Sequence, residues 1–404
     1  MAEKINPVTN LINNSQKTET NAAVGVKVAY IITLLELGGA QEVVLYTCEH
    51  LNKNKFDVIL ICGKGGKLDN KTKDIKTFFV KELVRQINPI NDLLAFVKIY
   101  KILKKEKPDI VHTHSSKAGI VGRWATYFLR LTTYDLRFMK IVHTIHGFGF
   151  NDEQNYFVRK IYIFVEWLAA KITNKFIAVS YENISKGLKN KIGFEKQYTV
   201  VRAGIKISDY QIKIDIDKKK KEFGIKNESV VGMVACFKKQ KAPLDFIKTA
   251  KLVCNEKPDT KFILVGDGVL RGKIEFEIKK LNLEKNVILA GWRNDVNEII
   301  KIFDIFILTS LWEGLPMVII EAMATGIPVV ATYVDGTKEV VQEGLTGFVV
   351  QPHETEKMAE RILRLLNDVN LRKKFSETAK KRVQEFDADL MVLDQERLYL
   401  SLLY

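Results

Sequence analysis

The chain has 404 residues, of which 47% are apolar and 27% are charged, and its formal net charge is +15. This length exceeds what one hydrophobic core normally encloses, so we expect two domains of about 180 residues each. No apolar run reaches the roughly 18 residues of a membrane span, and residues 1–23 are polar, without the apolar centre of a secretory signal. We therefore expect a cytoplasmic protein with a disordered lead-in over residues 1–24.

The positive charge indicates an acidic partner, namely nucleic acid, an anionic membrane face or a phosphorylated substrate. A compositional habit of the source, rich in lysine and isoleucine, is the alternative explanation. The cysteines show no paired spacing, which favours reduced thiols over disulfides or a zinc site. They are Cys48, Cys62, Cys236 and Cys254.

Strand and helix patterns alternate from the start of the first domain. Residues 26–33 predict a first strand, a glycine-rich turn at 37–42 leads into a helix ending near Asn52, and residues 56–62 predict the second strand. The turn lacks the Gly-x-Gly-x-x-Gly spacing of dinucleotide-binding proteins, so a dehydrogenase is disfavoured.

Two further strands, at 109–114 and 140–147, end in polar residues and follow a predicted helix over residues 91–106. A zinc cluster is disfavoured, because the two histidine pairs differ in spacing and no cysteine accompanies them. The histidines concerned are His112, His114, His143 and His146.

Segments 120–139 and 156–170 interleave arginine and lysine with aromatic residues and leucine. Helices of this kind usually pack their apolar side against the core. The alternative is a surface that lies in a membrane interface, with aromatic rings in the lipid boundary and cations at the headgroups.

The second half of the chain repeats the alternation of strands and helices. We expect a first domain over 25–205, closed by strands at 176–180 and 198–204, and a second domain over 206–384 that begins with a basic linker at 205–226. The tail from about Arg382 to Tyr404 reads as one helical pattern. Strands of the second domain are predicted at 229–235, 261–268, 286–291 and 305–310.

Glu313 and Glu321 bracket the start of a helix with Pro316 at its first position. The unpaired N–H groups and positive dipole end of that helix lie at the carboxyl end of a strand, where open α/β sheets bind their ligands. This pattern predicts a phosphate seat flanked by carboxylates that bind hydroxyl groups. Ordinary helix capping is the alternative.

Residues 310–347 strongly resemble the signature of retaining nucleotide-sugar glycosyltransferases of family four. The resemblance implies the GT-B fold, an α/β architecture of two Rossmann-like domains with parallel sheets facing across a cleft. It implies that Glu313 lies against the donor sugar and that Glu321 holds the ribose hydroxyls. The expected donor-binding residues at this helix start are Gly314, Leu315 and Pro316.

The first domain resembles the same family, especially members that build bacterial capsule, O-antigen or lipid-linked oligosaccharides. Gly38 and Gly39 match the loop that contacts the donor diphosphate. The segments HTHSSKAG and HTIHGFGF also resemble the family, and this resemblance implies that His146 lies in the sugar pocket, while His114 fits either a functional or a structural role. His112 and His143 are expected to make structural hydrogen bonds, and a helix at about 385–404 is expected to cross back onto this domain.

The loop after the first strand of the second domain departs from the family pattern. Family members carry an arginine there and a lysine five residues later, both facing the donor diphosphate. Lys241 matches the lysine, but Cys236 stands where the arginine is expected, so Lys238 or Lys239 is expected to supply the charge. Because members generally work without a divalent ion, we expect no metal and no cofactor besides the nucleotide-sugar.

The resemblance implies a retaining hexosyl- or N-acetylhexosaminyltransferase, with a nucleotide-sugar donor, expected to be UDP-linked, and a carbohydrate or polyprenyl-linked acceptor. Glu313, His146 and Lys241 are the expected catalytic residues. The protein is expected to be cytoplasmic, with a peripheral position at the inner face of the membrane. Two alternatives share the fold, a sugar-nucleotide epimerase or phosphorylase and a non-catalytic subunit, and Cys236 favours the latter. A nucleic-acid binder is disfavoured, because the chain carries no recognised motif for it.

Overall fold

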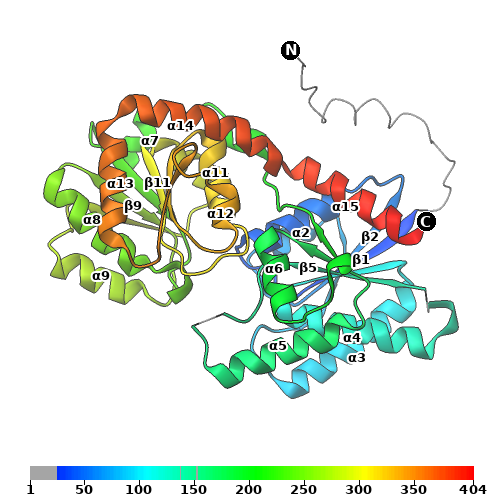
Figure 1. Ribbon diagram of the computed structural model, residues 1–404. Helices are drawn as coiled ribbons and strands as arrows, with labels where there is room; N and C mark the ends of the chain where they lie inside the picture. The colour runs from blue at the N-terminus through cyan, green and yellow to red at the C-terminus, as the bar shows by residue number, and fades with distance from the viewer. Residues whose placement is uncertain (1–24, 137, 152) are drawn as a thin grey trace, which may run out of the picture.

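The computed structural model describes residues 25–136, 138–151 and 153–404, which form two α/β domains joined at one side (Figure 1). The expected lead-in over residues 1–24 lies outside the described residues, so that prediction stays untested.

The first domain is built on a parallel seven-stranded sheet in the order β3-β2-β1-β4-β5-β6-β7. Its central strands are apolar almost throughout, as expected for strands covered by helices on both faces. The strands are β1 Val26–Ile32, β2 Phe56–Cys62, β3 Lys76–Phe79, β4 Ile110–His114, β5 Lys140–Ile145, β6 Lys175–Ala178 and β7 Tyr198–Val200. The helices are α2 Gly39–His50, α3 Pro89–Glu106, α4 Ser116–Thr132, α5 Tyr156–Ala170 and α6 Tyr181–Lys189, with a 3-10 turn η2 at Tyr134–Leu136.

The second domain holds a parallel six-stranded sheet in the order β10-β9-β8-β11-β12-β13. The strands are β8 Val230–Val234, β9 Lys261–Val265, β10 Val287–Gly291, β11 Ile305–Leu308, β12 Val329–Thr332 and β13 Gly347–Val350. The helices are α7 Ile216–Glu222, α8 Pro243–Glu256, α9 Arg271–Lys280, α10 Val296–Ile299, α11 Met317–Thr325, α12 Thr337–Val340, α13 Thr355–Asn367 and α14 Val369–Arg382. Two 3-10 turns, η4 at Ile207–Tyr210 and η5 at Lys239–Lys241, lie in the connections.

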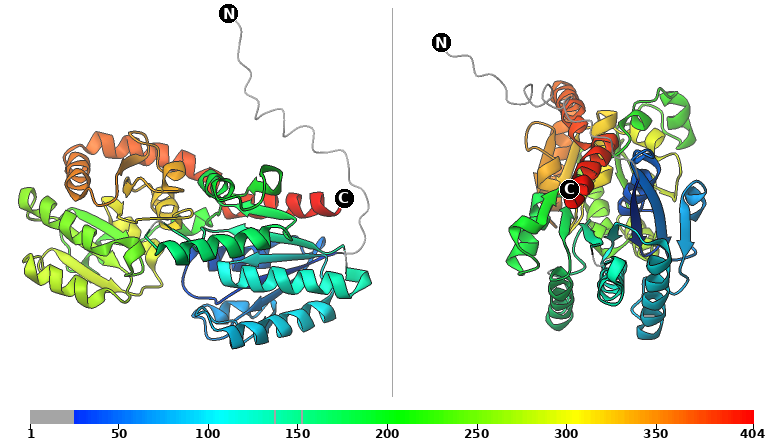
Figure 2. Two further views of the ribbon diagram at one scale, coloured as in Figure 1. Left: turned by 60° about the horizontal axis from the view of Figure 1, so that its bottom comes forward. Right: turned by 90° about the vertical axis from the view of Figure 1, so that its right-hand side faces the viewer.

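The C-terminal helix α15, Ala388–Leu403, leaves the second domain and lies along the first, where it packs against α2 (Figure 2). The prediction of one helix from Arg382 is wrong at this point, because α14 ends at Arg382 and a 3-10 turn intervenes. The backbone groups of Phe386 and Ala388 bond to Ile205 at 3.0 and 2.9 Å instead of continuing the helix. The two segments that cross between the domains are thereby paired.

Candidate active site

Segments of the two domains meet closely at two glycines, neither of which has space for a side chain. A Cβ atom added to Gly39, at the start of α2, would lie 2.6 Å from Cγ of Met317, at the start of α11. A Cβ atom on Gly314 would lie 1.6 Å from the carbonyl oxygen of His146. The glycines therefore allow the two domains to approach, and they bring the residues expected at the donor diphosphate to one place. Gly38 is the N-cap residue of α2, Pro316 is that of α11, and Leu315 is buried beside it.

Glu313 is buried in the loop after β11 and is held from three sides. Its Oε1 atom contacts Nζ of Lys241 and lies 2.6 Å from Oγ of Ser310. Its backbone N–H donates to the Asp335 carboxylate at 2.9 Å. The Glu313 carboxylate is thus fixed before any substrate arrives, which is the condition for electrostatic stabilisation without reorganisation.

The structure separates the two lysines that the sequence leaves open as replacements at Cys236. The side chain of Lys239 is 68% exposed and pairs with Glu153 of the first domain at 2.9 Å. Lys238 is half-buried, and burial, followed by the charge of Lys241, lowers the pKa of its ammonium group. Lys238 therefore lies beside Lys241 without a carboxylate partner among the described residues, as suits an anion site.

Glu321 lies on the second turn of α11 and is half-buried. Burial raises the pKa of its carboxyl group to about 7, while a hydrogen bond with Tyr210 opposes the shift and the charge of Glu42 adds to it. Tyr210 and Glu42 escaped the sequence analysis. Glu42, in the first turn of the helix after Gly-Gly-Ala, could have been found from its position, whereas nothing in the linker marks Tyr210.

His112 and His143 lie within β4 and β5, while His114 ends β4 and His146 follows β5. The expectation for His112 is confirmed, because its Nδ1 atom lies 2.5 Å from the Tyr399 hydroxyl and its Nε2 atom 2.6 Å from that of Thr144. His143 likewise bonds to Thr113 at 2.9 Å. His146 is half-buried, and burial lowers its pKa to about 4. His114, which fitted either role, lies 3.0 Å from His146.

No group of three or more His, Cys, Asp and Glu side chains placed to hold an ion occurs within residues 25–136, 138–151 and 153–404. The chain contains two Asp-x-Asp sequences, a pattern that can bind metal ions, at 215–217 and 387–389. In both, the first aspartate caps a helix. Asp215 accepts from the backbone of Lys218 at 2.9 Å, and Asp387 accepts from that of Asp389 at 2.8 Å. The cysteines are free thiols.

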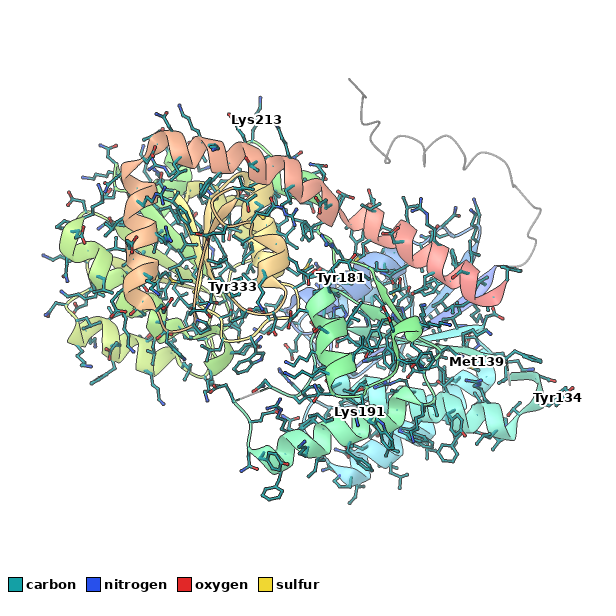
Figure 3. The ribbon with its side chains drawn as sticks, viewed as in Figure 1. Tyr134, Met139, Tyr181, Lys191, Lys213 and Tyr333 are labelled. Carbon is teal, nitrogen blue, oxygen red and sulfur yellow. The ribbon has the colours of Figure 1, made fainter. Side chains whose placement is uncertain are left out.

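Helices α4 and α5 differ in how far they bury their side chains. Helix α4 packs small and apolar residues inward, and its Arg123 forms a fully buried ion pair with Glu166 of α5 at 2.7 Å. Helix α5 buries only Glu166, Ala169 and Ala170. Several apolar side chains of α5 are exposed, and so are those of Tyr134 and Phe138 in the segment after α4, where Figure 3 shows Tyr134 at the outer edge of the domain. No described helix is long and apolar enough to span a bilayer.

The fold and the site together define a GT-B glycosyltransferase, and comparisons with known proteins agree. The family described as glycosyl transferases group 1 matches residues 215–382, and the family described as glycosyltransferase family 4 matches residues 37–209. The chain belongs to glycosyltransferase family 4. The predicted fold class is thereby confirmed, and neither an epimerase or phosphorylase nor a non-catalytic subunit is favoured.

Among curated proteins, the chain is 35% identical over 349 residues to UDP-Gal:α-D-GlcNAc-diphosphoundecaprenol α-1,3-galactosyltransferase of Escherichia coli, covering 85% of this chain and 88% of the relative. It is 28% identical over 364 residues to the capsular polysaccharide biosynthesis glycosyltransferase CapM of Staphylococcus aureus, covering 87% and 91%. Among solved structures, HepE of Anabaena in complex with UDP and glucose superimposes with a TM-score of 0.80 at 20% identity, covering 93% of this chain and 100% of that one.

Proposed function

We propose that this glycosyltransferase moves a hexose or N-acetylhexosamine from a UDP-sugar to a polyprenyl-diphosphate-linked saccharide, with retention of the anomeric configuration. The observation that carries the proposal is the buried Glu313 carboxylate, fixed by Lys241 and Ser310 beside the start of α11. The E. coli relative, whose name states a UDP-galactose donor and a diphosphoundecaprenol-linked acceptor, supports both substrate classes.

The site suits departure of the diphosphate and attack by the acceptor on the same face of the sugar. The bond from the anomeric carbon to the diphosphate oxygen breaks, and that oxygen keeps the electron pair. The acceptor oxygen bonds to the anomeric carbon, and its proton passes to the departing phosphate oxygen. Glu313 and His146 would position the sugar while the cations stabilise the leaving group.

Lys238 and Lys241, together with the starts of α2 and α11, supply the positive field that the leaving diphosphate needs. In this proposal Lys238 replaces the arginine that Cys236 lacks. Its lowered pKa reflects burial beside another lysine, and a bound diphosphate would remove that cost. The proposed reaction therefore needs no divalent ion.

Glu321 would hold the two ribose hydroxyls, since a carboxylate accepts two hydrogen bonds at once. The direct test is a thermal-shift screen against UDP-, GDP- and ADP-sugars, followed by a transfer assay with polyprenyl-diphosphate-linked acceptors. A ligand at 100 times its Kd should stabilise the protein by about 2.7 kcal/mol. Absence of a shift with every UDP-sugar contradicts the proposed donor, and an inverted anomeric product contradicts retention.

The lipid of the acceptor would contact a surface that we call the α3–α5 face. This face would lie against the cytoplasmic side of the membrane. Helices α3, α4 and α5 lie side by side (Figure 1), and Lys160 contacts the Tyr156 ring. Aromatic residues interleaved with cations suit a lipid interface. The exposed apolar side chains of this face are Ile87, Ile90, Leu93, Leu94, Val97, Phe128, Leu131, Tyr134, Phe138, Tyr156, Phe157, Val158, Ile161 and Phe164.

Cosedimentation with vesicles tests this placement. Phe157→Ser on α5 should weaken binding to anionic vesicles, whereas Phe276→Ser on α9 of the second domain should not, although the two rings are similarly exposed at 73% and 68%. Equal binding by both variants and the wild type would remove the α3–α5 face from the membrane.

A further inference from the structure

The two histidine rings that meet at the edge of the first sheet form a pair. His114 is the last residue of β4 and is 1% exposed, and His146 follows the end of β5. Nδ1 of His114 lies 3.0 Å from Nε2 of His146, and the ring centroids are 5.3 Å apart. One nitrogen of this contact must carry the shared proton.

Both rings are neutral at neutral pH. Burial lowers the pKa of His114 well below its ordinary value and that of His146 to about 4. A neutral imidazole has one N–H and one bare nitrogen, so the identity of the donor in this contact fixes the tautomer of both rings.

The other ring nitrogen of His114, Nε2, decides which of the two histidines donates the hydrogen bond. Nε2 of His114 is buried and has no hydrogen-bond partner among the described residues. The rings of Tyr30 and His112 lie beside the His114 ring, with centroids 5.7 and 4.2 Å away. If His146 donated to His114, the His114 proton would be an orphaned N–H in this enclosure, an arrangement that native proteins rarely keep. If His114 donates, only a bare nitrogen is left without a partner.

We propose that His114 is a positioning residue for the transfer reaction: its Nδ1–H donates to Nε2 of His146 and thereby places the His146 proton on Nδ1. This inference rests on the proposed function, in which His146 faces the donor sugar. Nδ1 of His146 has no hydrogen-bond partner within the described chain, so it is the nitrogen left for a ligand. His146 then offers the sugar a hydrogen-bond donor, which suits a hydroxyl or phosphate oxygen.

The tautomer can be read without substrate. In protein with ¹⁵N-labelled histidine, two-bond ¹H–¹⁵N correlation spectra distinguish a protonated ring nitrogen from a bare one, and a His146→Gln sample assigns the signal. We expect the bare nitrogen of His146 to be Nε2. A proton on Nε2 of His146 in the wild type would overturn the inference, whether or not the protein proves to use a UDP-sugar.

Three substitutions separate positioning from packing. His114→Asn retains an N–H donor near the place of Nδ1, His114→Asp offers only acceptors, and His114→Leu offers neither. We expect kcat to fall on the order of 10²-fold in the Leu and Asp variants, the scale of a misplaced catalytic group, and to be largely kept in the Asn variant. The KM for the donor should change much less than kcat.

His143→Asn is the matched control, since His143 is also a buried strand histidine but bonds to Thr113 on the other face of the sheet. Its kcat should stay near the wild-type value, and melting temperatures of all variants identify any that fail to fold. Equal losses in the Asn, Asp and Leu variants that fold would show that His114 acts by packing alone and would overturn the inference. If the wild type binds no sugar nucleotide, the proposed function fails, while the spectrum still decides the tautomer.

Discussion

The hydroxyl group of Tyr399 lies 2.6 Å from that of Tyr30, fully buried between the C-terminal helix α15 and strand β1. The same Tyr399 oxygen contacts Nδ1 of His112 at 2.5 Å and donates to Gln395 at 3.2 Å. A residue five positions from the end of the chain thus completes a polar network under the first sheet. Because every member is buried, each depends on the others for its hydrogen bonds.

Tyr399→Phe should destabilise the first domain by about 1–3 kcal/mol, because Tyr30 and His112 lose a buried partner. Urea unfolding, followed by fluorescence, measures the change. Tyr404→Phe removes the hydroxyl of a residue that is 87% exposed and should leave the midpoint unchanged. An equal effect of the two substitutions would show that the network contributes nothing.

Glu321 should make stability fall as pH rises. Its pKa is raised from 4.5 to about 7, so between these values the folded protein keeps a proton that the unfolded chain has released. The cost is absent below pH about 4.5 and complete above pH about 7, where it amounts to at most about 3 kcal/mol. Glu321→Gln should therefore raise the melting temperature at pH 8 and leave it nearly unchanged at pH 4.5. The same gain at both pH values would contradict the raised pKa.

Glu313→Gln should lower kcat more than it weakens donor binding. The amide keeps the size of the side chain and can still contact Ser310, but the charge proposed to face the donor sugar is lost. We expect a loss on the order of 10²-fold in kcat, measured in a transfer assay with the cognate UDP-sugar. Glu360→Gln, on the surface of α13, should have no effect. Full activity in Glu313→Gln would leave Glu313 as a structural acid.

Lys238→Met should weaken donor binding by about 1.5–3 kcal/mol, whereas Lys239→Met should not. The reason is their placement, because Lys238 lies half-buried beside Lys241 while Lys239 is exposed and paired with Glu153. Titration calorimetry with the sugar nucleotide measures both. Cys236→Arg should restore part of the affinity in Lys238→Met, since a guanidinium grips a phosphate with two hydrogen bonds. Equal affinities for the two lysine variants would rule out Lys238 as the replacement.

Transfer should continue in excess EDTA, because in the proposed reaction the lysines and helix starts stabilise the charge of the leaving diphosphate. Initial rates with and without the chelator measure this directly. Activity that EDTA abolishes and magnesium or manganese restores would contradict a metal-independent reaction.

Much of the fold was predictable because the local pattern of apolar residues indicates the strands and helices. Continuous apolar runs mark parallel strands that are buried on both faces, and the strands at 26–33, 56–62 and 305–310 were found in this way. The edge strand β3, Lys76–Phe79, escaped because it is short and largely not buried. The break before α15 escaped because it depends on pairing with Ile205, 182 positions earlier in the sequence (205 against 387).

For the site, the sequence by itself determined which residues follow the predicted strands, because Glu313 comes directly after a predicted strand, His146 closes one, and Glu321 lies on the helix that follows Glu313. The tertiary structure alone decided how these groups are held and charged. It left Lys238 half-buried beside Lys241 and paired Lys239 with Glu153. It also placed Tyr210 and Glu42 near Glu321 and His114 against His146. Burial and the distances between groups from different strands and domains set pKa values and hydrogen bonds, and these quantities arise only once the chain has folded.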